Sequence, residues 1–191
     1  LDAVISTSTE PVRVEFEMFG ISRNEIPDVD NLHSIIKKCR DSNRDEPDAY
    51  KFFDNADDLM SQSTINVLRI SDHNTIGLEG TDTCAKGTGW SRLVKENGSS
   101  NKGQSSGGSF GIGKSATFAC SDLRIVFYSS LDKKGFKSNF GVAKLVSYND
   151  EKMGWTTGIG YYSENEKFTA IPELATFDKN YIREDTGTDI Y

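Results

Sequence analysis

A glycine-rich run near the middle of the chain carries the clearest chemistry in the sequence. From Gly108 to Ser115 it reads GSFGIGKS, and an expected helix begins directly after it. Glycines let bare backbone N–H groups come close to a phosphate, and the N-terminus of a helix favours a bound anion. The run therefore predicts a phosphate-binding loop.

Three interpretations of this run differ in what must precede it. It fits the P-loop pattern GxxxxGK[ST], and Gly111-x-Gly113-x-x-Ala116 resembles a dinucleotide-binding turn, but both motifs need a buried strand immediately before them. Residues 97–109 contain only Gly, Ser, Asn, Lys and Gln and predict no strand. Such a stretch buries too little apolar surface to offset the entropy of ordering. The third interpretation is therefore a hinged lid that closes over a triphosphate with its N–H groups.

A lid of this kind predicts a separate pocket for the base. Asp72 follows an expected strand over residues 65–70 and is itself followed by Gly77. The N6 amino group of adenine is a donor, and a half-buried carboxylate is a strong acceptor for it. An Asp at a strand end is also a common turn former, so both roles stay open for Asp72 at this point.

The elements that must position these residues follow from the apolar pattern. Residues 12–18 alternate between apolar and polar side chains, which is typical of a half-buried strand. Helices come early and strands gather late, which predicts an α+β sandwich with helices on one face of a mixed sheet. We expect strands over 12–18, 65–70, 123–128, 140–146 (with a bulge near Gly141) and 155–162, and helices over 30–39, 47–60 and 116 to about 120.

Composition and charge exclude several classes of protein. The 191 residues suit one domain, and no apolar run approaches the ~18–20 residues of a membrane helix. A net charge of −7 argues against a domain that holds nucleic acid by bulk charge alone. Two histidines are too few for a zinc site. Three cysteines without a CxxC pair are typical of reduced thiols in a cytoplasmic protein.

The order of these parts resembles the GHKL, or Bergerat-fold, ATPases, which include gyrase, MutL, the MORC proteins and sensor histidine kinases. That family runs from an N-box helix through an Asp-containing strand end, a flexible lid and a glycine box to a late Gly-Thr step. The matching segments, which span nearly the whole chain, are 1–3, 72–78, 97–109, 108–114 and 187–190. Among subfamilies, the chain looks most like prokaryotic MutL/MORC relatives associated with DNA restriction or defence.

The resemblance implies a fold and a set of site residues. The fold would be a two-layer α/β sandwich over residues 1–191, with a mixed, mostly antiparallel sheet, helices on one face and a flexible ATP lid at about 81–113. Asp72 would accept from adenine N6, Thr188 would support it through a shared water, and Gly77 would let the base approach. The phosphates would be bound by N–H groups of Gly108, Gly111, Ile112 and Gly113, with Lys114 as a point charge.

Two departures from the family pattern bear on activity. The usual Asp-x-Gly-x-Gly is here Asp72-x-Asn74-x-x-Gly77, and Asn is the non-glycine residue that best tolerates a left-handed backbone. Asp2-Ala3 resembles the tail of an N-box, which would place the catalytic Glu and the Mg²⁺-binding Asn before Leu1. The catalytic residues are therefore not assigned, and no metal ligand is assigned within the chain.

The resemblance implies ATP and Mg²⁺ as cofactors and ATP hydrolysis that drives lid closure in a larger, DNA-acting or defence-related protein. The alternatives are a nucleotide-binding interaction module with little turnover and a P-loop NTPase that uses residues 108–115. A phosphotransferase is disfavoured, because neither histidine lies in a phosphoacceptor helix. Candidate partners are DNA or other subunits, through regions outside this chain, and a second copy in an ATP-dependent homodimer. No membrane is expected.

Overall fold

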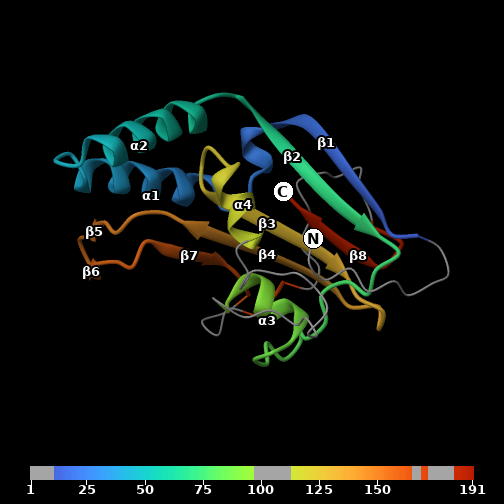
Figure 1. The fold of residues 1–191 in the computed structure, drawn as a ribbon. Helices are drawn as coiled ribbons and strands as arrows, with labels where there is room; N and C mark the ends of the chain where they lie inside the picture. The colour runs from blue at the N-terminus through green and yellow to red at the C-terminus, as the bar shows by residue number, and fades with distance from the viewer. Residues whose placement is uncertain (1–10, 97–112, 165–168, 172–182) are drawn as a thin grey trace.

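A six-stranded sheet forms the centre of the protein (Figure 1). The computed structural model describes residues 11–96, 113–164, 169–171 and 183–191, without the side chains of residues 113 and 114. The strand order is β1-β2-β8-β3-β4-β7, and every pairing in it is antiparallel. Its strands are β1 (Arg13–Ser22), β2 (Thr64–His73), β3 (Ile125–Leu131), β4 (Lys137–Lys144), β7 (Ile159–Tyr162) and β8 (Gly187–Ile190).

The remaining elements are helices and one small ribbon. They are the 3₁₀ turn η1 (Arg23–Glu25), the helices α1 (Val29–Ser42), α2 (Pro47–Met60), α3 (Gly89–Val94) and α4 (Gly113–Ala119), and a ribbon of β5 (Asn149–Asp150) and β6 (Gly154–Trp155). The predicted α+β class and mostly antiparallel sheet are confirmed. Within the described residues, no helix combines the length and apolar character needed to cross a membrane.

The two faces of the sheet carry separate cores. Side chains alternate between faces along each strand, so the register assigns each residue to one of them. On one face, which we call the α4 face, Val126, Tyr128 and Phe140 pack with α3 and α4. On the other, the hairpin face, Val67 and Phe127 pack with α1 and α2. The prediction that helices cover one face is therefore wrong.

The α1–α2 hairpin explains this correction. It is inserted between β1 and β2, which pair along their full lengths, and it lies at one end of the sheet (Figure 1). Its apolar side chains, including Ile36, Phe53 and Met60, are buried. A shift of one residue in strand pairing would move every side chain of a strand to the other face of the sheet. The apolar pattern of a single segment does not show the pairing, so it does not predict which face the hairpin covers.

Helix α3 is, with strand β8, one of the elements that the sequence pattern missed. Thr88 caps it by accepting a hydrogen bond from the Ser91 N–H at 3.2 Å. Trp90 is 1% exposed and meets the Phe140 ring edge-on. Part of the predicted lid at 81–113 thus belongs to the core of the α4 face, while residues 97–112 lie outside the described residues.

Two glycines account for differences between the predicted and the observed strands. At Gly141 the ladder between β3 and β4 runs without the expected bulge. A Cβ there would lie 2.8 Å from the Phe127 ring, so the glycine makes room for a side chain. The expected strand over 155–162 is interrupted at Gly158, whose φ of +73° places it in the left-handed region.

Candidate functional site

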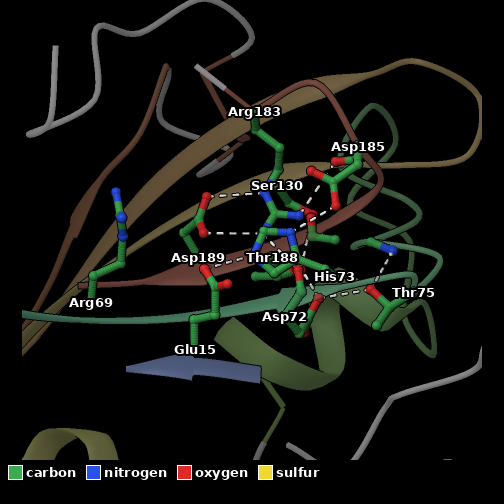
Figure 2. Close-up of polar contacts among 12 residues, drawn as sticks. Glu15, Arg69, Asp72, His73, Thr75, Ser130, Arg183, Asp185, Thr188 and Asp189 are labelled. Atoms are coloured by element: carbon green, nitrogen blue, oxygen red, sulfur yellow. Dashed lines mark hydrogen bonds and ion pairs between the residues drawn. The ribbon is translucent and has the colours of Figure 1, made fainter. Parts of the chain in front are cut away.

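Asp72 stands near the end of β2 and is fixed by two donors (Figure 2). Its Oδ1 accepts a hydrogen bond from the Thr188 N–H at 2.8 Å and another from the Thr75 hydroxyl at 2.7 Å. Thr188 follows Asp72 by 116 positions. The structure therefore brings together Asp72 and Thr188, two of the three residues that the resemblance assigns to the base.

Ser130 on β3 joins the same cluster, and no sequence motif pointed to it. Its hydroxyl accepts from the Leu78 N–H at 2.8 Å, donates to the Gly187 carbonyl at 2.9 Å, and lies 3.1 Å from Thr188 Oγ1. Ser130 and Thr188 are both buried. One side chain thus ties β8 and the segment after β2 to β3.

The turn after Asp72 has the backbone that the sequence predicts. Asn74 has φ +61° and Gly77 has φ +67°, so the asparagine does take the left-handed conformation expected of it. A Cβ on Gly77 would lie 2.2 Å from the Leu131 carbonyl oxygen. Gly77 therefore allows the turn to pack against β3, and its proposed role in admitting a base stays a prediction.

The second oxygen of the Asp72 carboxylate is the chemically available group. Among the residues that the structure describes, none donates a hydrogen bond to Oδ2 of Asp72. The side chain is half-buried. A carboxylate held through one oxygen, with the other free to accept, can bind an amino group of a ligand in a fixed direction.

The α4 face carries both this cluster and the helix that follows the glycine box. Asp72 and Ile70 are two residues apart on β2, so their side chains share a face. In the ladder Ile70 is opposite Ile190, and Ile190 is opposite Tyr128, so this face is the α4 face. Burial raises the pKa of Tyr128 to about 12, against the opposing effect of a hydrogen bond with Thr117 of α4. That contact fixes α4 to β3.

The phosphate-site predictions can be located only in part. Gly113 and Lys114 begin α4, and their side chains lie outside the described residues. Gly108, Gly111 and Ile112 also lie outside them. Thr117 and Phe118 place α4 on the same face of the sheet as Asp72, and the phosphate-binding role of the residues before them stays a prediction.

A cavity of about 490 Å³ opens beside the cluster. Ile70, Val126 and Ile190 line it from the sheet, and Ala116 and Thr117 line it from α4. Asp72 lies two residues after Ile70, and Thr188 lies two residues before Ile190. Neither of them lines the cavity. The volume is within the usual range for a small-molecule site, roughly 300–1,000 Å³.

A second polar network lies behind the cluster and was not anticipated. Arg183 donates to both carboxylate oxygens of Asp189, each at 3.0 Å. His73 lies 2.7 Å from the Asp185 carboxylate and 3.4 Å from that of Glu15 (Figure 2). These side chains join residues 183–189 to the end of β2 and the start of β1. No short motif marks them, because the partners are far apart in the sequence.

Within the described ranges, no group of three or more His, Cys, Asp and Glu side chains is arranged to hold a metal ion. The Mg²⁺ that the resemblance implies stays a prediction, because Mg²⁺ is usually held by one or two carboxylates together with substrate phosphates.

The pair of His73 and Asp185 makes stability depend on pH. Burial tends to raise the pKa of Asp185, but the hydrogen bond with His73 and the charges of His73 and Arg183 outweigh it and lower the pKa. A carboxylate whose pKa is lowered in the folded state stabilises the fold above its unfolded pKa, and this contribution is lost as the pH falls through the folded value.

We therefore expect Asp185→Asn to unfold at lower urea concentration than the wild type at about pH 5, with a gap that shrinks below about pH 4. Urea unfolding of the two proteins from about pH 5 to about pH 2.5 measures the gap. A gap of constant size across this range would contradict the assignment.

Comparison of the chain with models of known protein families, with curated protein sequences and with solved structures gives no match. The GHKL resemblance is thus carried by the residues quoted above.

Proposed function

We propose that this chain is an adenine-nucleotide-binding module of the GHKL type, with ATP as its ligand and Asp72 as the residue that recognises the base. One observation carries the proposal: Asp72 is held through Oδ1 by Thr188 and Thr75, while Oδ2 has no donor among the described residues. Adenine offers a donor at N6, where guanine has an acceptor at O6. The site is therefore complementary to adenine.

The position of the cluster supports the same proposal. Asp72 and α4 lie on one face of the sheet. A cavity of about 490 Å³, lined by β2, β3 and α4 and also by residues of α1 and α2, lies near them without Asp72 in its lining. A base bound at Asp72 would leave its phosphates on the side of the sheet where α4 begins. The N-terminus of α4 together with the preceding glycines would supply N–H groups to them.

The sheet topology disfavours the P-loop alternative. A P-loop follows directly on a buried strand of a parallel sheet covered by helices on both faces. Every pairing of the described six-stranded sheet is antiparallel, and the last described element before the glycine box is the short helix α3. Lys114 would then act as an auxiliary charge and not as the central phosphate ligand.

The proposal covers binding and derives no hydrolytic step. Neither the catalytic residues nor a metal ligand is assigned within the chain, so ATP turnover has no residue behind it here. Hydrolysis, coupling to a larger DNA-acting or defence-related protein and ATP-dependent dimerisation remain proposals that rest on the resemblance. A nucleotide-binding module with little turnover is the second candidate, since the chain's own residues supply the base site.

Calorimetry with ATP, ADP and GTP, each with and without Mg²⁺, tests the proposal. We expect ATP and ADP to bind at least about tenfold more tightly than GTP, because one charge-assisted hydrogen bond contributes about 1.5–3 kcal/mol. Equal affinities for ATP and GTP would favour a phosphate-directed site such as a P-loop. No binding of any nucleotide would contradict the proposal.

A further inference from the structure

A buried arginine lies behind the candidate base site. Asp189 follows Thr188 on β8, so its side chain lies on the opposite face of the sheet, where it is 0% exposed. Nε and Nη2 of Arg183 donate to its two carboxylate oxygens, each at 3.0 Å, and the arginine side chain is itself only 5% exposed. The result is a bidentate pair that is almost completely buried.

The same guanidinium also binds the backbone of the site residue. Nη2 of Arg183 donates to the Asp72 carbonyl oxygen at 2.7 Å, and Nη1 donates to the Asp185 carbonyl oxygen at 3.3 Å (Figure 2). Gly187 makes room for this contact: a Cβ there would lie 2.1 Å from Nη1 and 2.2 Å from the Asp72 carbonyl oxygen. Arg183 therefore connects β8 to the end of β2 at the residue that carries the free carboxylate oxygen.

Asp72 is thus held at both its backbone and its side chain. Arg183 binds its backbone carbonyl, and the Thr188 N–H binds its Oδ1. With both ends of the residue fixed, the direction of Oδ2 is set before any ligand arrives. Such preorganisation strengthens binding by removing the cost of ordering the group.

We propose that Arg183 is a positioning residue for base recognition: paired with Asp189, it holds β8 against the end of β2 and thereby aims the Asp72 carboxylate. The proposal rests on the proposed function, because the carboxylate is aimed at an adenine. Arg183 acts through Asp72 and does not contact the nucleotide. Lysine would not replace it, because one ammonium lacks the planar set of donors that binds Asp189 and Asp72 together.

The choice of variants follows from the buried charge. Removing Arg183 alone would leave the Asp189 carboxylate buried without a partner, which is strongly destabilising. Arg183→Lys keeps the charge balanced, and the double variant Arg183→Met with Asp189→Asn removes both charges. Arg44→Lys, at a side chain that is 69% exposed, is the matched control.

The first readout needs no nucleotide. Hydrogen exchange of the Thr188 amide reports on its bond to Asp72 Oδ1. We expect this amide to exchange at least about tenfold faster in Arg183→Lys and in the double variant, with the amide of Val142 in β4 and the Arg44→Lys control unchanged. Unchanged exchange of Thr188 in both variants would overturn the positioning role, whatever the protein binds.

The second readout is base selectivity. We expect Arg183→Lys to reduce the preference for ATP over GTP by about tenfold, and to have no further effect when Asp72 is already Asn. Equal weakening of ATP and GTP would indicate a purely structural role and overturn the proposal. A wild-type protein that binds neither nucleotide would refute the proposed function instead, and the Thr188 exchange would still decide whether Arg183 fixes Asp72.

Discussion

Asp72→Asn is expected to weaken ATP binding by about 10–100-fold and to shift the preference of the protein toward GTP. The asparagine oxygen can still accept from Thr188 and Thr75, so the local fold is retained. Its NH₂ group then replaces Oδ2, and an acceptor becomes a donor. That donor cannot form a hydrogen bond with the N6 amino group of adenine, which is also a donor, but it can donate to the O6 oxygen of guanine. Calorimetry with both nucleotides measures the shift.

The matched control for this variant is Asp45→Asn, at an exposed position between α1 and α2. It removes the same charge and should leave both affinities unchanged. If Asp72→Asn bound ATP with the same affinity as the wild type, the carboxylate would not recognise the base. That result would favour the P-loop interpretation of residues 108–115.

Gly77→Ala is expected to destabilise the fold strongly. The alanine would combine a φ of +67° with a Cβ 2.2 Å from the Leu131 carbonyl oxygen, so the turn must move away from β3. Left-handed backbone alone costs about 1–2 kcal/mol, and displacing a strand adds to it. We expect a loss of roughly 3 kcal/mol or more in the free energy of unfolding, measured by urea titration.

Gly135→Ala separates the two contributions. Gly135 has φ +85°, and a Cβ there would meet nothing within 4 Å, so only the backbone cost applies. We expect about 1–2 kcal/mol for this control. If both alanine variants lost the same free energy, the packing of the turn against β3 would not have the role assigned to it.

The sequence predicted the elements that depend mainly on the spacing of nearby residues. The alternation over 12–18 gave β1, the apolar spacing after Pro47 gave α2, and Asn74 took the expected left-handed backbone. The meeting of Asp72 and Thr188, 116 positions apart, was expected only from the resemblance. Lys114 and the residues of the glycine box were predicted from a motif that the described residues do not test.

What the sequence did not reveal depends on tertiary contacts. The six residues of α3 are held by the burial of Trp90 and not by an amphipathic repeat. The placement of helices on both faces follows from strand register. Arg183 reaches Asp72 across 111 positions, and its role becomes visible only when Gly187 is seen to leave room for it.

A crystal structure with a non-hydrolysable ATP analogue tests the central claim most directly. The account predicts that adenine N6 lies about 3 Å from Asp72 Oδ2, with the phosphates toward the N-terminus of α4. An analogue bound with its base away from Asp72, or held only by its phosphates, would contradict the account.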